Sequence, residues 1–252
     1  MTNGLTINRD GAVARIHMAR PPHNFFDEPV LRGIADALEV HDGDASVRVT
    51  LLTAEGRSFC AGADFAATRG SANGARAIYA QAARLFDRAK PLVAAVGGPA
   101  VGGGLGLALA ADFRVASPEA RFHANFAAIG LHPGFALTVT LPALLGSQRA
   151  RDLMLTARRV GGEDAASIGL ADRLAPAEHL MEEALAFAHG IAANAPLALT
   201  SIARALPRID GEAARAAMTA ELAEQDRLFA TSDFREGVRA SRERRSPIFT
   251  GV

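Results

Sequence analysis

Near its beginning, the chain passes from a strand-like to a helix-like spacing of apolar side chains. Residues 5–9 and 12–19 are expected to form two strands, and the Asp10-Gly11 pair between them is typical of a hairpin turn. A loop with two prolines follows at 20–27. An amphipathic helix is then predicted from about residue 28 to residue 40, with Val30, Leu31, Ile34 and Leu38 on its apolar face.

Two nearly continuous apolar runs, 47–53 and 91–96, are typical of strands buried on both faces of a sheet. Each run leads into a glycine-bearing segment, 58–64 (SFCAGAD) after the first and 101–110 (VGGGLGLALA) after the second. The second segment is rich in leucine and alanine beyond its glycines, so we expect a helix to begin there. Both strands should therefore end in a turn at an edge of the sheet.

The middle of the chain continues this alternation of strands and helices. We expect a helix over 75–89, preceded by a mobile lid at 68–74, and short strands at 113–116 and 171–174. The alternation predicts an α/β fold, with one core over 1–174. From residue 175 to residue 252 a helical region is expected, with helices at 177–193, 196–206, 211–230 and 233–243.

The two glycine-bearing segments can bring two backbone N–H groups to one point. The N–H of Gly103 would lie in the first turn of a helix, where it has no intrahelical partner and where the helix dipole attracts negative charge. With the N–H of Ala61, it would stabilise an oxyanion. Each such donor is typically worth about 2.7–4 kcal/mol in analogous sites. The alternative is that both segments are only tight turns.

A dinucleotide-binding fold also offers a strand, a glycine cluster and a helix, but its fingerprint fails here. A G-x-G-x-x-G motif begun at Gly102 would need glycine or alanine at position 107, where the chain has leucine. No lysine follows these glycines, as a P-loop requires, and no G-x-S-x-G motif is present. A nucleotide-dependent enzyme is therefore disfavoured.

Several motifs in a fixed order resemble the crotonase superfamily, also called the enoyl-CoA hydratase/isomerase family, over essentially the whole chain. They are Arg20-Pro21 with Asn24, the segment 58–64, Gly97-Gly98 leading into Gly102-Gly103-Gly104, Asp112, Pro133-Gly134, and the tail segments 233–237 and 244–249. The resemblance implies a crotonase-like core of repeated ββα turns with a C-terminal helical region. It also implies a homotrimer or a dimer of trimers.

The resemblance further implies that an acyl-CoA thioester binds with its carbonyl between the amides of Ala61 and Gly103, so that an enolate can form. Coenzyme A would enter as part of the substrate, with no other cofactor, and the implied activity is that of a lyase or isomerase in fatty acid metabolism. The substrate would be bound by Gly62, Ala63, Asn24, Phe25, Gly102, Gly104, Pro133, Gly134 and Arg245. Phe25 and Phe26 could instead fill the core, and the basic cluster at 242–245 could be an ordinary solvated face.

The chain departs from the family at the two glutamates that hydratases use to add water. Aligned with the family, those positions hold Gly106 and Phe126, and no Asp or Glu lies between Arg121 and Pro142. Two-glutamate hydration is therefore doubtful. In some relatives, such as the dihydroxynaphthoyl-CoA synthases, bound bicarbonate replaces a missing glutamate, and Gly106 would leave room for such an anion.

Three residues near these positions are candidates for the missing acid or base: His132, His123 and Asp64. Histidine can exchange protons near neutral pH, and His132 lies beside Pro133-Gly134, in the loop that the family places along the acyl pocket. Each histidine could equally be a buried or capping side chain, and Asp64 could simply hold its own turn. The reaction could be isomerisation, hydration by a rearranged acid and base, or hydrolysis of an acyl-CoA or related carbonyl compound. A non-catalytic CoA-binding scaffold is a further alternative.

Composition narrows the partners and the compartment. Lys+Arg and Asp+Glu balance at 27 each, which argues against a nucleic-acid-binding protein. No long apolar run occurs, so no membrane span is expected, and the seven histidines show no metal-ligand spacing. The single cysteine, Cys60, excludes an internal disulfide and fits a cytoplasmic location.

Overall fold

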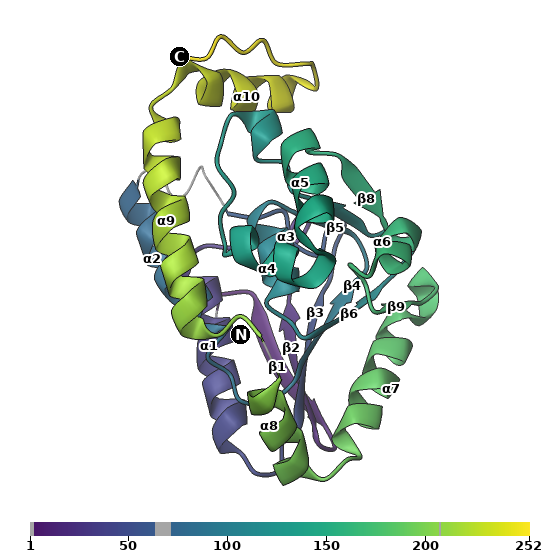
Figure 1. Cartoon of the computed structure of the whole chain (residues 1–252). Coiled ribbons are helices and arrows are strands. Elements are labelled where there is room, and N and C mark those ends of the chain that lie inside the picture. The colour runs from purple at the N-terminus through teal and green to yellow at the C-terminus, as the bar shows by residue number, and fades with distance from the viewer. Residues whose placement is uncertain (1–2, 64–71, 207) are drawn as a thin grey trace.

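The computed structural model describes residues 3–63, 72–206 and 208–252, and a six-stranded sheet runs through its centre (Figure 1). The strand order is β1-β2-β3-β4-β6-β9, and every neighbouring pair is parallel except the β1–β2 hairpin. The strands are β1 (Leu5–Asp10), β2 (Val13–Met18), β3 (Val49–Ala54), β4 (Leu92–Val96), β6 (Phe113–Ala116) and β9 (Arg173–Leu174). The hairpin and the two buried strands predicted from the apolar pattern are confirmed.

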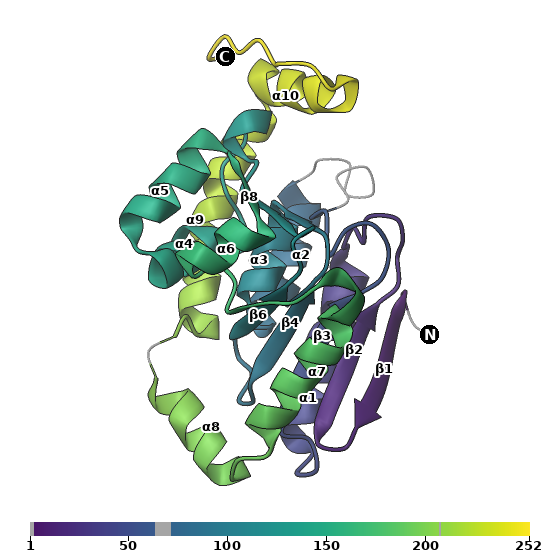
Figure 2. The ribbon, with the colours of Figure 1, turned by 90° about the vertical axis from the view of Figure 1, so that its right-hand side faces the viewer.

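The central strands are buried on both faces, as their apolar runs predicted. On one face, Val49, Leu51 and Val93 pack against the alanines of α7 (Leu180–Ala192). On the other face, Leu52 and Ala94 join the larger core, which includes α1 (Glu28–Gly43). Figure 2 shows α7 and α1 on opposite sides of this sheet. The sheet is thus held rigidly between helices, and its strand ends position the loops that follow.

Capping side chains begin several helices where the sequence changes character. Asp27 accepts a hydrogen bond from Val30 N at the start of α1, and Asp210 does the same for Ala213 N in α9 (Gly211–Phe229). The other helices are α2 (Ala72–Arg84), α3 (Gly103–Leu109), α4 (Leu137–Leu145), α5 (Ser147–Thr156), α6 (Gly162–Ile168), α8 (Pro196–Ala205) and α10 (Ser232–Glu243), with short 3₁₀ turns at Ala127–Ile129 and Ala177–His179. The helix expected over 75–89 therefore begins earlier, at Ala72, and ends earlier, at Arg84. Of the lid expected at 68–74, residues 72–74 belong to the first turn of α2 instead, and residues 68–71 lie outside the described residues.

A second, three-stranded sheet escaped the sequence analysis. It consists of β5 (Pro99–Val101), β7 (Arg121–His123) and β8 (Arg159–Gly161), in that order. Three-residue strands carry too short a pattern to be recognised from periodicity. This small sheet matters because β5 leads directly into α3, and therefore fixes where the glycines of α3 lie.

The C-terminal helices lie around the core rather than within one compact layer. The long helix α9 runs beside α2, and α10 lies at one end of the molecule with the C-terminus (Figure 1). The tail folds back on α10, where the Asp233 carboxylate accepts hydrogen bonds from Thr250 N and Gly251 N. Within the described ranges, no single helix is long and apolar enough to cross a membrane; residues 177–192 and 196–205 pass that test only as a pair, bent by 97°.

Candidate active site

The two glycine-bearing segments meet, as the sequence analysis expected. Cys60 N donates to the carbonyl of Pro99 at 3.1 Å, and Val101 N donates to the carbonyl of Cys60 at 3.0 Å, so the two chain segments run side by side. A side chain on Gly104 would place its Cβ 2.0 Å from the Cys60 oxygen, which only glycine avoids. A Cβ on Gly62 would lie 3.4 Å from Gly103 N. The turns are therefore in direct contact.

The amide of Ala61 is not available for a ligand, contrary to expectation. It donates to the carbonyl oxygen of His23 at 2.9 Å, and its hydrogen is used in holding the loop at 20–27. Gly62 has a φ of +92°, a left-handed conformation that turns the chain before Ala63. The amides of Ala63 and Gly103 have no hydrogen-bond partner within the described part of the chain, and both residues line a cavity. The donor pair that the geometry offers is thus Ala63 with Gly103.

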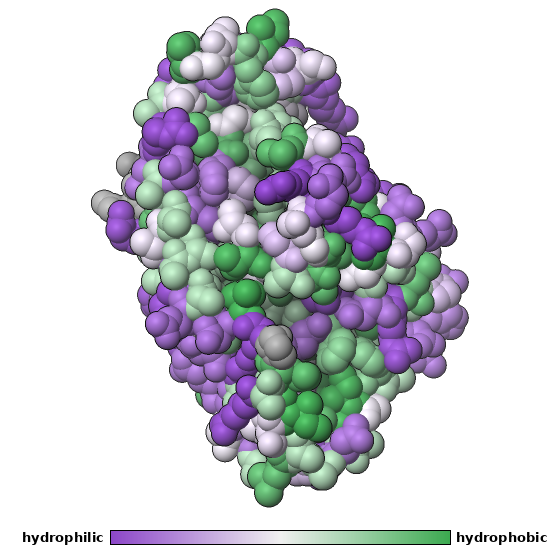
Figure 3. All heavy atoms as spheres, in the orientation of Figure 1, coloured by the Kyte–Doolittle hydropathy of each residue, from purple (hydrophilic) through white to green (hydrophobic). Residues whose placement is uncertain are grey.

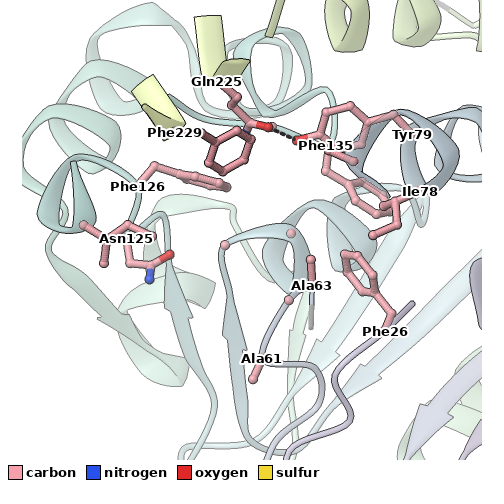
Figure 4. A pocket seen from close by; sticks show the side chains of 16 residues that line it. Phe26, Ala61, Ala63, Ile78, Tyr79, Asn125, Phe126, Phe135, Gln225 and Phe229 are labelled. Carbon is pink, nitrogen blue, oxygen red and sulfur yellow. Dashed lines mark hydrogen bonds between the residues drawn. The ribbon is translucent and has the colours of Figure 1, made fainter. Parts of the chain in front are cut away.

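Aromatic side chains surround this cavity. Phe26, Phe126, Phe135 and Phe229 line it together with Ile78, and Figure 4 shows them around an opening above Ala63. The rings of Phe26 and Phe135 have centroids 5.5 Å apart and are tilted by 54°. Such walls exclude water and lower the local dielectric, which strengthens any hydrogen bond between a backbone N–H and a developing oxyanion.

Both positions where the family resemblance places hydratase glutamates are apolar in the structure. Phe126 is buried and lines the cavity. Gly106 is covered, because a Cβ there would lie 2.5 Å from the Cβ and 2.7 Å from the Cγ of Phe135. The expectation that Gly106 leaves room for an anion is therefore wrong: Phe135 fills that space.

Tyr79 and Gln225 bring polar atoms to the same cavity. The Tyr79 hydroxyl donates to Gln225 Oε1 at 2.9 Å, a bond drawn in Figure 4, and Gln225 Nε2 donates to the carbonyl of His132 at 2.9 Å. Burial raises the pKa of Tyr79, with a smaller contribution from Glu221. The phenol is therefore kept protonated and serves as a hydrogen-bond donor at neutral pH.

The two candidate histidines, His132 and His123, do not reach this cavity. The His132 side chain turns to its own neighbour, with Nδ1 2.8 Å from the Pro133 carbonyl. His123 lies on β7 and uses Nε2 to donate to the Ala157 carbonyl at 2.8 Å, and burial lowers its pKa. Neither imidazole is among the side chains that line the cavity. Asp64 lies outside the described residues.

The other predicted substrate-binding residues divide into two groups. Gly62, Ala63, Gly102, Gly103 and Gly134 line the cavity. Asn24 is buried instead, where its side-chain amide donates to the Ser58 carbonyl at 2.8 Å and braces the loop. Phe25 is exposed at the surface, edge-on to His23, while Gly104 serves the close packing against Cys60 and Pro133 is only half-buried.

Arg245 is engaged within its own subunit rather than held free for a phosphate. Its guanidinium donates to Glu236 Oε2 at 2.9 Å and to Glu243 Oε2 at 2.6 Å. These bonds hold the tail against α10, and the hydrogen bonds from Arg245 keep the pKa of Glu236 well below its usual range. The predicted contact of Arg245 with CoA would require exchanging these partners.

Cys60 lies behind the donor pair, fully buried. Burial raises the pKa of its thiol to about 12, so it is not an activated nucleophile. Over the described residues, no group of three His, Cys, Asp or Glu side chains is placed to hold a metal ion.

Sequence reasoning missed Tyr79, Phe135, Gln225 and Phe229 as cavity residues. They come from α2, from the loop before α4 and from α9, which are far apart in the sequence. An aromatic residue or a glutamine on a helix is an ordinary core or surface residue by pattern alone. These side chains meet at the cavity because α9 packs against α2 and α4, and no pattern in the sequence predicts that packing.

Comparison with known proteins places these features in a family. The family model for enoyl-CoA hydratase/isomerase matches residues 8–252. A putative enoyl-CoA hydratase from Thermus thermophilus is 37% identical over 254 residues, covering 95% of this chain and 98% of that protein. A carnitinyl-CoA dehydratase from Proteus mirabilis is 34% identical over 260 residues, with full coverage of both chains.

Solved structures agree with this assignment. An enoyl-CoA hydratase/isomerase from Pseudoalteromonas atlantica superposes with a TM-score of 0.87 at 30% identity, over 98% of this chain and 100% of that one. An enoyl-CoA hydratase from Mycobacterium avium subsp. paratuberculosis gives a TM-score of 0.85 at 29% identity, over 99% and 100%. The expected crotonase-like α/β fold is thereby confirmed.

Proposed function

The chain belongs to the enoyl-CoA hydratase/isomerase family, and from that premise we propose that it binds an acyl-CoA thioester and stabilises an enolate or oxyanion at its carbonyl oxygen. The backbone N–H groups of Ala63 and Gly103 are the proposed donors, with Ala63 taking the place first assigned to Ala61. The observation that carries the proposal is that these two amides line one aromatic-walled cavity and lack a protein partner within the described ranges.

The chemistry suits this arrangement. A thioester α-proton leaves, or a nucleophile adds to the carbonyl or the conjugated double bond, only if the charge that develops on oxygen meets donors already in place. Gly103 begins α3, so its N–H lies at the positive end of that helix. The amide of Gly102 donates to the His123 carbonyl at 2.9 Å, which fixes the turn just before the donor.

The backbone donor can be tested by removing one hydrogen. Proline is tolerated at the first position of a helix, so Gly103→Pro deletes the N–H while keeping the helix start. Gly103→Ala is the matched control, because its Cβ meets the same atom, Phe26 Cζ at 2.7 Å, but its N–H remains. We expect Gly103→Pro to lower kcat/KM by roughly 10²–10³-fold relative to Gly103→Ala. Equal rates for the two folded variants would refute the donor role.

The reaction is identified by liquid chromatography coupled to mass spectrometry of the protein incubated with a mixed acyl-CoA pool, because chromatography separates isomers of equal mass. A gain of one water, an isomer of unchanged mass with a shifted double bond, or release of free CoA distinguishes hydration, isomerisation and thioester hydrolysis. Tight CoA binding without any product would favour a non-catalytic scaffold. That alternative is supported by the residues at the two glutamate positions, since Phe126 is apolar and Gly106 is covered by Phe135.

We propose in addition that the subunits assemble as a homotrimer or a dimer of trimers in the cytoplasm, with no cofactor beyond the coenzyme A of the substrate. The support is the apolar surface of α8 and of Leu206, the residue that follows it: Leu197, Ile202 and Leu206 are 86%, 56% and 60% exposed beside an apolar groove. Figure 3 shows apolar residues gathered over this part of the molecule. Burying them against a neighbour would remove the exposed patch. Light scattering after gel filtration measures the mass directly, and a monomer at micromolar concentration would contradict the assembly.

A further inference from the structure

The wall of the cavity around Phe135 adopts an unusual backbone conformation. Phe135 and Ala136 have φ angles of +62° and +57°, and neither is a glycine. Left-handed conformations of such residues cost of order 1–3 kcal/mol each, and persist where surrounding contacts enforce them. This conformation directs the Phe135 ring into the space beside Gly106, where it is completely buried.

Glu221 on α9 supplies the contacts that enforce this conformation. Its carboxylate accepts hydrogen bonds from Ala136 N at 2.9 Å, from Thr138 N at 3.0 Å and from Thr138 Oγ1 at 2.6 Å. Glu221 is 1% exposed, so these three donors replace water around a buried carboxyl group. The left-handed pair is therefore tied to α9 through its own backbone.

Gln225, one helical turn farther along α9, holds the other side of the same loop. It donates to the His132 carbonyl and accepts from Tyr79, so it links the loop to both α9 and α2. A Cβ on Gly134 would lie 1.8 Å from the Tyr79 oxygen and 2.7 Å from Gln225 Nε2. The loop from His132 to Thr138 is thus clamped at both ends, with Phe135 between the clamps.

We propose that Phe135 sets the size limit for the acyl group in this cavity, and that Glu221 and Gln225 are positioning residues that hold it there. The inference rests on the proposed binding of an acyl-CoA thioester. The cavity beside Ala63 and Gly103 has a volume of 70 Å³. A cavity of this size has room for only a few small groups. The ligand class it favours is an acyl-CoA with a short, apolar acyl group.

The test measures selectivity for acyl length rather than activity. Dissociation constants for CoA, butyryl-CoA and octanoyl-CoA are determined by calorimetry for the wild type, Phe135→Ala and Phe135→Leu. Shortening the side chain opens the space beside Gly106. The ratio of the octanoyl-CoA to the butyryl-CoA constant should therefore fall by about tenfold or more, since a fitted methylene is worth at least that much in an apolar pocket. The leucine variant keeps the test valid if the alanine variant does not fold.

The positioning role is tested by Glu221→Gln. The carboxylate of Glu221 accepts hydrogen bonds with both of its oxygens, whereas the glutamine side chain would place an NH₂ group opposite some of the same donors. We expect the same ratio to fall, by less than in Phe135→Leu. Met218→Ala is the matched control, because Met218 is equally buried on α9 but is an apolar residue without these hydrogen bonds. Phe113→Ala is the control for loss of a ring, since Phe113 packs on Phe187 against the other face of the sheet.

These outcomes distinguish a failure of the proposed function from a failure of the size limit alone. If the wild type binds no acyl-CoA, the proposed function fails together with the inference. If acyl-CoA binds but both Phe135 variants keep the wild-type ratio within about twofold, only the size limit is overturned. If Met218→Ala changes the ratio as much as Glu221→Gln does, Glu221 has a general structural role and not a positioning one.

Discussion

Phe135 occupies the space that a side chain at Gly106 would need: a Cβ built on Gly106 would lie 2.5 Å from the Cβ of Phe135. The two residues are far apart in the sequence, but they form one wall of the cavity. A carboxylate could not simply be introduced at position 106, because both the ring of Phe135 and the backbone that carries it would have to move first. The pairing of a glycine with a buried aromatic ring therefore decides what chemistry this wall can offer.

This pairing predicts a strong energetic coupling. Gly106→Ala should lower the free energy of unfolding by about 1–3 kcal/mol, as overpacking does. Added to Phe135→Ala, which keeps the Cβ of residue 135 but removes the ring atoms Cγ and Cδ1 at 2.7 and 2.8 Å, it should cost less than it does in the wild type, by about 0.5–3 kcal/mol. Urea denaturation of the two single variants and the double variant measures this. Gly190→Ala is the control, because nothing lies within 4 Å of a Cβ there on α7, and it should be neutral or slightly stabilising. Strict additivity would contradict the contact.

His132→Ala should leave turnover within about threefold of the wild type, well short of the 10²–10⁴-fold loss expected on removing a general acid or base. The reason is that His132 Nδ1 is 2.8 Å from the carbonyl of Pro133, and the ring does not line the cavity. The measurement is kcat with the best substrate from the acyl-CoA pool. A hundredfold decrease in a folded variant would restore His132 as the catalytic residue that its sequence position suggested.

Cys60 should be inert in the native protein. Its side chain is fully buried and its pKa is raised to about 12, so almost no thiolate is present or accessible at neutral pH. We expect a chromogenic thiol reagent to modify the single cysteine in urea but not within hours under native conditions. Rapid native labelling would show that the glycine turn over Cys60 opens readily.

Stability should decrease as the pH falls from about 7 towards 5, because burial lowers the pKa of His123 in the folded chain while the unfolded value stays near 6.5. The unfolded state then takes up a proton that the native state resists, so acid favours unfolding. His41, whose pKa is also lowered by burial, adds to the same trend. His123→Gln keeps a donor for the Ala157 carbonyl and should flatten the pH dependence of the unfolding free energy. An unchanged slope would exclude His123 as a contributor.

Predictions from the sequence were most accurate where a local pattern carried the whole signal. The hairpin, the buried strands β3 and β4, the helix after the glycine cluster and the helices from α7 to α10 follow from periodicity and turn residues, and family membership followed from the order of motifs. The sheet of β5, β7 and β8 was missed because three-residue strands carry too little pattern.

The active-site prediction was right about the segments and wrong about one atom. The sequence analysis predicted that the turn at 58–63 and the start of α3 meet, and they do. It named Ala61 as the donor, but the N–H of Ala61 donates to the carbonyl of His23. Which amide of a turn faces a cavity depends on backbone dihedral angles such as the +92° φ of Gly62, and these are not encoded in motif spacing.

By itself, then, the sequence determined the family, the order of the elements and the presence of paired glycine turns, since each is written in residues close together along the chain. Only the tertiary structure decided that Ala63 joins Gly103, that Phe135 fills the space at Gly106, and that Glu221 on a distant helix holds Phe135 in place. The reason is that a cavity is formed by side chains from separate elements, and their packing depends on long-range contacts that no local pattern records.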